Sequence, residues 1–184
     1  MKEVILMRVW VTTLALMLFA PSLAMASAVV YPGITGYGGV HALPRAAVQP
    51  SAAAEYKAIF DVTTGSKNPS GINPGIMHVI RAVNVFASAH VPLSHLHFIV
   101  ILHGAATSAA LDNIHYKKVF GKNNPNISML RKLKAAGVSV YVCGQAMFDF
   151  HYPGSWVGKN VTVALSALST LVIYGDQGYA YLKQ

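Results

Sequence analysis

The sequence alternates between short apolar runs and longer segments in which apolar residues recur every three or four positions. Residues Phe98 to Leu102 are apolar at every position, which is typical of a β-strand covered on both faces. Residues 56–62 and 138–142 are similar short runs with β-prone side chains. Two further strands are predicted at residues 160–165 and 178–182.

The segments between these runs carry helix signals. Asn73 followed by Pro74 marks a helix start, and the apolar residues that follow keep helical spacing up to about His90. Further helices are predicted at residues 105–120, between residues 124 and 137, from residue 145, and at residues 166–174. Strands that alternate with helices predict a single α/β domain with a mainly parallel sheet and helices on both faces.

The N-terminus has the pattern of an export signal. Lys2 and Arg8 precede an apolar run from Val9 to Ala20, and Ala24-Met25-Ala26 is a small-x-small cleavage site. We therefore expect a signal peptide over residues 1–26, cleaved after Ala26, and a periplasmic or secreted protein. An uncleaved N-terminal anchor is the alternative, and no later segment is predicted to enter a membrane.

The remaining chain divides into two parts. Residues 27–54 are rich in Ala, Gly and Pro without a sustained period, so we expect a flexible arm. The α/β domain should then cover residues 55–184 and is long enough to bury a core.

The charge pattern narrows the range of partners. The full chain has a net charge of +8, and residues 27–184 keep 12 basic and 5 acidic residues, hence +7. The basic residues are scattered and are not interleaved with aromatic ones, so nucleic acid is not an expected partner. No glycine-rich nucleotide motif and no G-x-S-x-G elbow occurs, so we expect no nucleotide cofactor and no serine hydrolase.

Three side chains suited to chemistry lie at the expected carboxyl ends of strands, namely Asp61, His103 and Cys143. Because the carboxyl ends of parallel strands share one edge of the sheet, these groups form a site if their strands are neighbours. Cys143 is the only cysteine, so the fold contains no internal disulfide. Its thiol is either reactive or a small buried hydrophobic group.

The residues after Cys143 favour a reactive thiol. Gly144 allows a tight turn, and a helix beginning at Gln145 would point unpaired N–H groups at the sulfur and stabilise a thiolate. We expect Cys143 and His103 to be the catalytic pair. Neighbouring residues are expected to line this site: Asp61, Gly104, Gly144 and Gln145.

His95 and His97 raise the question of a metal site. They share one face of a strand, but His103 lies about 20 Å further on at about 3.3 Å per residue. No Cys, Asp or Glu is near these two histidines in sequence. We therefore interpret them as a polar strand entrance and expect no metal.

Five segments, in this order and within residues 55–184, resemble the DsrE/DsrF-like family of sulfur-relay proteins: Tyr56–Asp61, Phe98–Gly104, Leu133–Val138, Val140–Gln145 and Gln177–Tyr181. The resemblance implies a five-stranded flavodoxin-like fold that assembles as trimers or hexamers. It also implies that Cys143 carries sulfur as a persulfide, which passes to a partner thiol or small sulfur compound, and that His103 orients or deprotonates the thiol.

Two features depart from the family pattern, because the chain carries an export signal and has no second cysteine. Any sulfur transfer is therefore intermolecular. The leading hypothesis is an exported, sulfurtransferase-like sulfur carrier. The alternatives are a non-catalytic small-molecule-binding or assembly module with a structural cysteine, and a redox sensor that forms intersubunit disulfides.

Overall fold

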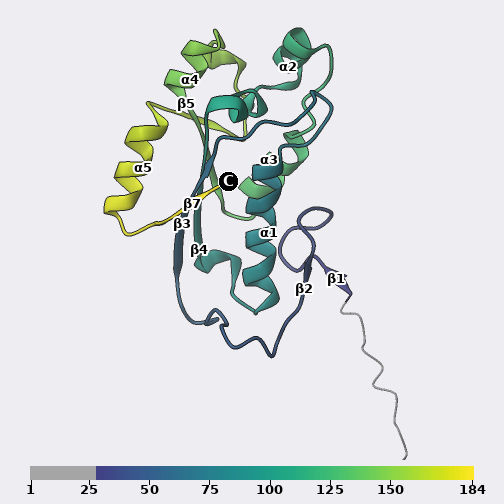
Figure 1. The fold of residues 1–184 in the computed structure, drawn as a ribbon, viewed down its shortest axis with the longest axis vertical. Coiled ribbons are helices and arrows are strands. Elements are labelled where there is room, and N and C mark those ends of the chain that lie inside the picture. The colour runs from purple at the N-terminus through teal and green to yellow at the C-terminus, as the bar shows by residue number, and fades with distance from the viewer. Residues whose placement is uncertain (1–27) are drawn as a thin grey trace, which may run out of the picture.

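The computed structural model describes residues 28–184, and its centre is a five-stranded parallel sheet (Figure 1). The strands lie in the order β6-β5-β4-β3-β7, and every neighbouring pair is parallel. Their bounds are β3 Tyr56–Val62, β4 Leu96–Leu102, β5 Ser139–Cys143, β6 Thr162–Ala164 and β7 Ala180–Lys183. The predicted α/β fold class is confirmed. The predicted signal peptide, residues 1–26, lies outside the described residues.

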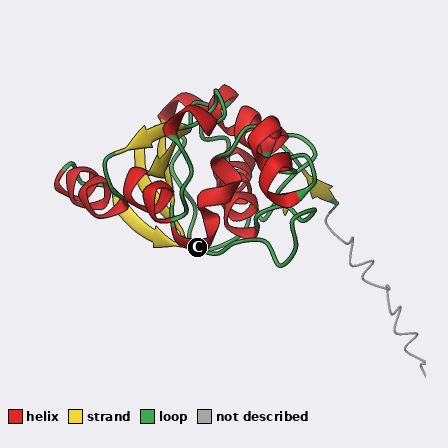
Figure 2. Ribbon diagram, turned by 90° about the horizontal axis from the view of Figure 1, so that it is seen from above, coloured by secondary structure: helices red, strands yellow, loops and turns green. Residues whose placement is uncertain are grey.

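Helices cover both faces of this sheet (Figure 2). The α-helices are α1 Pro74–Ser88, α2 Asn113–Phe120, α3 Ile127–Ala135, α4 Gly144–Asp149 and α5 Ala167–Asp176, and the 3₁₀ turns are η1 Leu93–His95, η2 Gly104–Ala110 and η3 Gly154–Trp156. The chain steps from β3 to β6 in one direction with α1 and α3 on one face. It then returns to β7 at the other edge, so a right-handed crossover puts α5 on the opposite face. Within residues 28–184, no helix is long and apolar enough to cross a bilayer.

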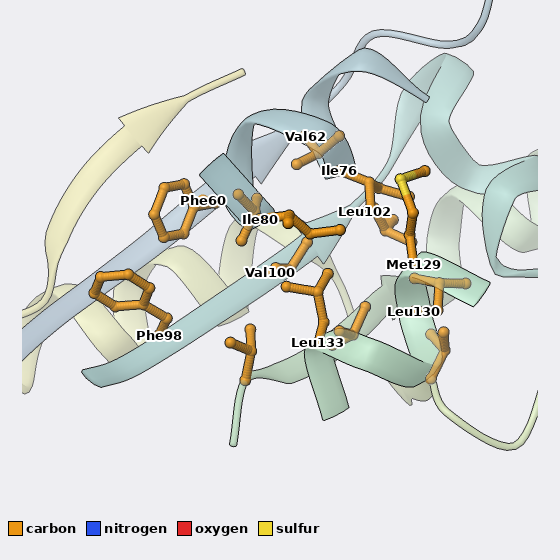
Figure 3. Packing of buried hydrophobic residues seen from close by; sticks show 14 of the residues in the cluster. Phe60, Val62, Ile76, Ile80, Phe98, Val100, Leu102, Met129, Leu130 and Leu133 are labelled. Atoms are coloured by element: carbon orange, nitrogen blue, oxygen red, sulfur yellow. The ribbon is translucent and has the colours of Figure 1, made fainter. Parts of the chain in front are cut away.

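The main core lies between the sheet and the pair α1 and α3 (Figure 3). Alternate strand residues such as Phe60 and Val100 point to this side and meet Ile80 of α1 and Leu133 of α3. Because side chains alternate along a strand, the intervening residues face α5 in a smaller cluster. The sheet is therefore buried on both faces, as the uninterrupted apolar run of β4 predicted.

One predicted helix is divided in two. The sequence pattern predicted a helix over residues 105–120, whereas the structure has the 3₁₀ turn η2 followed by α2. Asp112 separates them because its carboxylate caps α2, accepting the N–H of His115 at 2.8 Å. Leu111, just before it, is extended and forms a bridge with Val157.

Part of the segment expected to be a flexible arm folds against the domain. Strands β1 Val29–Val30 and β2 Val40–His41 form an antiparallel pair. Between them, Ile34 is buried against the main core. The physical cause is Asn84 in α1, a fully buried residue whose side-chain amide bonds to the backbone of residues 33–38.

Candidate functional site

The three residues predicted at strand ends lie on neighbouring strands. Asp61 is in β3 and pairs in register with Ile101 of β4. Leu102 pairs with Val142 of β5, so His103 and Cys143 each follow at the next position. All three have the side-chain parity of the face that packs on α5. The structure therefore brings an acid, an imidazole and a thiol to one edge and one face of the sheet.

Asp61 links this edge through two hydrogen bonds. Its carboxylate accepts from Nε2 of His103 at 2.5 Å and from the hydroxyl of Tyr181, in β7, at 2.6 Å. Asp61 is buried, and because its carboxylate can only accept, Nε2 of His103 carries a proton. In the neutral ring, Nδ1 is then the hydrogen-bond acceptor.

Tyr181 is a member of this cluster that the sequence analysis did not single out. Its hydrogen bond to Asp61 raises the pKa of the phenol above the ordinary value of 10.0. The bond depends on β7 lying beside β3, and the order of strands cannot be read from the sequence. The strand predicted at residues 178–182 and the family resemblance of Gln177–Tyr181 pointed to this part of the chain, but neither indicated the contact with Asp61.

Cys143 lies at the start of α4, as predicted, but it is buried. Its residue is 5% exposed, and its sulfur accepts the N–H of Ala146 at 3.4 Å. The surrounding cluster is apolar and includes Ile101 of β4 and Ala167 of α5. Within residues 28–184, the sulfur makes no hydrogen bond with His103. The thiol and the Asp61–His103 pair thus lie on neighbouring strands without a hydrogen bond between them in the described residues.

The glycines and the glutamine predicted to line the site lie on two sides of it. Gly104 follows His103 with a φ of +53°, a conformation that favours glycine. Gly144 begins α4, where a Cβ would come within 2.8 Å of the carbonyl oxygen of Ala164 in β6. Gln145 is exposed and donates to the carbonyl of Leu165 at 3.4 Å. Gly144 and Gln145 therefore tie α4 to the β6 edge.

His95 and His97 lie at the opposite, amino-terminal end of β4 and meet an acid there. The carboxylate of Glu55 is 2.5 Å from Nε2 of His97 and 3.7 Å from Nε2 of His95. This contact was not foreseen, because Glu55 is 40 residues before His95 in the sequence. Among residues 28–184, no group of three or more His, Cys, Asp or Glu side chains is arranged to hold a metal ion.

Comparisons with known proteins agree with this architecture. The fold defines a flavodoxin-like α/β protein, and a similar solved structure is that of a protein of unknown function from Methanobacterium thermoautotrophicum. The two share 14% identity with a TM-score of 0.55, over 71% of this chain and 100% of the other. Such low identity supports the fold alone. No curated protein matches.

A comparison with protein-family models identifies the family of this chain. The model of the DsrE/DsrF-like family matches residues 57–183, so the chain belongs to the DsrE/DsrF-like family. Membership supports a sulfur-relay function in general terms, which agrees with the resemblance found in the sequence.

Proposed function

We propose that this protein carries sulfane sulfur as a persulfide on Cys143. The observation that carries the proposal is the position of the only thiol. Cys143 is the last residue of the interior strand β5, and its sulfur accepts the N–H of Ala146. It shares a sheet face with the Asp61–His103 pair. A thiol that accepts a helix N–H, on the same edge of the sheet as an oriented imidazole, is suited to thiolate chemistry.

The proposed reaction is a sulfur transfer without net oxidation. Nδ1 of His103 accepts the thiol proton, and the Cys143 thiolate attacks the outer sulfur of a persulfide or polysulfide. A new S–S bond forms, the S–S bond of the donor breaks, and the donor leaves as a thiolate. Asp61 stabilises the imidazolium. Because the chain has no second cysteine, an acceptor thiolate of another molecule removes the sulfur.

Burial of the thiol adds a step before transfer. Cys143 is 5% exposed and packs in the same cluster as Ala167 of α5. In the proposal, α5 or the first turn of α4 moves away before a donor reaches the sulfur. Loading is therefore slower than reaction of an exposed thiol with the same donor.

Mass spectrometry after exposure to polysulfide tests the carrier proposal. The expected result is a gain of one sulfur atom on Cys143, formed ten-fold or more slowly in His103→Ala because a general base is lost. His97→Ala is the matched control, since His97 lies at the start of β4 and His103 just after its end. A chain that never gains this mass contradicts the proposal.

The alternative, a binding or assembly module with a structural cysteine, is favoured by the apolar surroundings of the sulfur. It expects no sulfur on Cys143 and a loss of stability in Cys143→Ser. The carrier proposal expects loading in the wild type whatever the stability of that variant. The two proposals therefore predict different masses for the wild-type protein after exposure to polysulfide.

We also propose that the chain forms a homo-oligomer through α5. Large apolar side chains are exposed on this helix and just before it, namely Leu165, Leu168, Val172 and Ile173. Surfaces of this kind mark interaction sites, and the family resemblance favours a trimer or hexamer. Light scattering after size-exclusion chromatography would detect the oligomer, and Leu168→Asp should reduce it to a monomer.

Export is the last part of the proposal. The support is the signal pattern of residues 1–26, and cleavage after Ala26 would leave the β1–β2 pair whole because β1 begins at Val29. The N-terminal sequence of the protein recovered from a periplasmic or culture fraction should begin at Ser27. A retained Met1 would favour the anchor instead.

A further inference from the structure

A cavity of about 420 Å³ opens at the carboxyl edge of the sheet, apart from the thiol. It lies between the loop after β3, the start of η2, α2 and the residues after α4. Neither Cys143 nor His103 lines it. Its volume is in the range of small-molecule sites, and the carboxyl edge of a parallel sheet is where such sites occur.

The loop after β3 gives one wall of the cavity an affinity for negative charge. Lys67 is the only charged residue in the lining and has no ion pair within residues 28–184. The backbone N–H groups of Gly65 and Ser66 make no hydrogen bond in the described chain. Gly65 packs closely on η2, since a Cβ there would lie 2.8 Å from the carbonyl oxygen of Ala105. Free donors and one unpaired cation favour an anionic group.

Another part of the lining is aromatic. Phe150 and Tyr152 stack with ring centroids 5.8 Å apart and an interplanar angle of 19°. The ring centroids of Tyr116 and Phe120 are 4.5 Å apart. Burial, and then the nearby Tyr152, raise the pKa of Tyr116, so its hydroxyl stays protonated and donates to the carbonyl of Pro69 at 3.0 Å. Aromatic faces of this kind favour a flat ring over a branched aliphatic group.

Buried asparagines hold the loop after β3 in place. The N–H of Asn73 donates to Asn126 at 2.7 Å, and Nδ2 of Asn126 donates to Asn124 at 2.9 Å. Asn73 also donates from Nδ2 to the carbonyl of Thr64 at 2.7 Å, in the loop after β3. These amides are occupied with one another and with the backbone, so they fix the loop side of the cavity and leave Lys67 and the rings to contact a ligand.

We infer that this cavity binds a small planar aromatic molecule that carries an anionic group. The ring lies against Phe150 and Tyr152, and the anion lies at Lys67 and the N–H groups of the β3 loop. This site is independent of sulfur transfer at Cys143, and it gives a ligand class to the binding-module alternative.

Calorimetric titration of the purified chain with 1-naphthyl phosphate tests the inference. Inorganic phosphate supplies the anion alone and 1-naphthol supplies the ring alone. We expect 1-naphthyl phosphate to bind at least about ten-fold more tightly than either, because both walls contribute. Equal affinity for 1-naphthyl phosphate and one of its parts, or no binding at millimolar concentration, overturns the inference.

Variants separate the two walls without disturbing the core. Lys67→Gln should weaken the binding of 1-naphthyl phosphate by about ten-fold and leave the binding of 1-naphthol unchanged. Phe150→Leu, at an exposed ring, should weaken both by about five-fold. Lys122→Gln is the matched control, since this lysine is exposed and outside the lining. Binding that Lys67→Gln leaves intact, or that Lys122→Gln weakens as much, overturns the assignment of the anion.

Discussion

Asp61 and Tyr181 are 120 residues apart in the sequence, yet the hydroxyl of Tyr181 donates a hydrogen bond of 2.6 Å to the Asp61 carboxylate. The contact exists because β7 lies beside β3 at the edge of the sheet. The other oxygen of the same carboxylate accepts from His103. The orientation of the imidazole that follows β4 therefore depends on Tyr181 in the last strand of the sheet.

The first prediction concerns the alkaline titration of Tyr181. Its hydrogen bond to Asp61 raises the pKa of the phenol above 10.0 in the folded protein. A raised pKa means that the bond stabilises the fold fully below pH 10 and that this contribution is lost as the pH rises through the folded pKa. The pKa values of Tyr116, Tyr152 and Tyr174 are raised as well, so the absorbance of the tyrosinates should show several titrations above that of ordinary tyrosine, and one of them should disappear in Tyr181→Phe. Tyr179→Phe is the control, and an unchanged curve in Tyr181→Phe would contradict the assignment.

The second prediction concerns Asp61→Asn. The amide cannot accept from both His103 and Tyr181 as the carboxylate does, and it does not stabilise an imidazolium. The rate of persulfide formation on Cys143 should therefore fall by about ten-fold or more, while the final extent of loading stays the same. Time-resolved mass spectrometry measures both quantities. Asp176→Asn, at an exposed carboxylate, should load at the wild-type rate. Equal rates for the two variants would remove Asp61 from the mechanism.

The third prediction concerns the anchor of the N-terminal segment. Asn84 makes five hydrogen bonds to the backbone of residues 33–38, so Asn84→Ala should release that segment and cost about 2 kcal/mol. Limited proteolysis followed by mass spectrometry should then find cuts between residues 28 and 41. Segments that resist protease in this variant would show that Asn84 is not the anchor.

Two glycines in the same segment give a matched pair for that experiment. Gly38 has a φ of +56°, and a Cβ there would lie 2.5 Å from the backbone nitrogen of Arg81 in α1. Gly36 has a φ of +81° but faces open space. Alanine at either position carries the strain of a positive φ. Any protease cleavage in Gly38→Ala beyond that in Gly36→Ala therefore reports on the contact with α1.

The fourth prediction concerns the cap of α2. Partial burial alone would raise the pKa of Asp112, but hydrogen bonds from the backbone and ring of His115 outweigh it and hold the pKa below 3.8. Asp112→Ala should lower the free energy of unfolding by about 1 kcal/mol near neutral pH.

The acid dependence of that loss has a definite sign. Because the pKa is depressed in the folded state, the carboxylate stabilises the protein above pH 3.8, and the contribution is lost as the pH falls through the folded pKa. Urea denaturation at several pH values should show the wild type and Asp112→Ala converging in acid. Asp149→Ala, at an exposed residue of α4, is the control. A difference that persists in strong acid would contradict capping by the carboxylate.

Much of the sheet could be predicted from local patterns. Local patterns placed His103 and Cys143 at the carboxyl ends of their strands. The signals were the apolar run at Phe98–Leu102 and the strand before Gly144, because periodicity and turn residues can be recognised locally. The helix expected over residues 105–120 was divided because capping by Asp112 outweighed the continuous pattern.

Contacts between distant segments were beyond local patterns. The sequence gives no order of strands, so the partnership of Tyr181 with Asp61 was missed. The burial of Cys143 depends on α5 crossing to the second face of the sheet, which follows only from that order. Asn84 has the helical spacing of its neighbours, and nothing around it in the sequence indicates that its amide holds residues 33–38.

Helix α5 packs over the cluster that contains Cys143 and also presents Leu168 and Val172 to solvent. A subunit seated on those two side chains would press the helix onto the sheet and keep the thiol closed. Dilution into monomers would then free α5 to move and expose the thiol, so the rate of Cys143 alkylation should increase as the protein concentration falls.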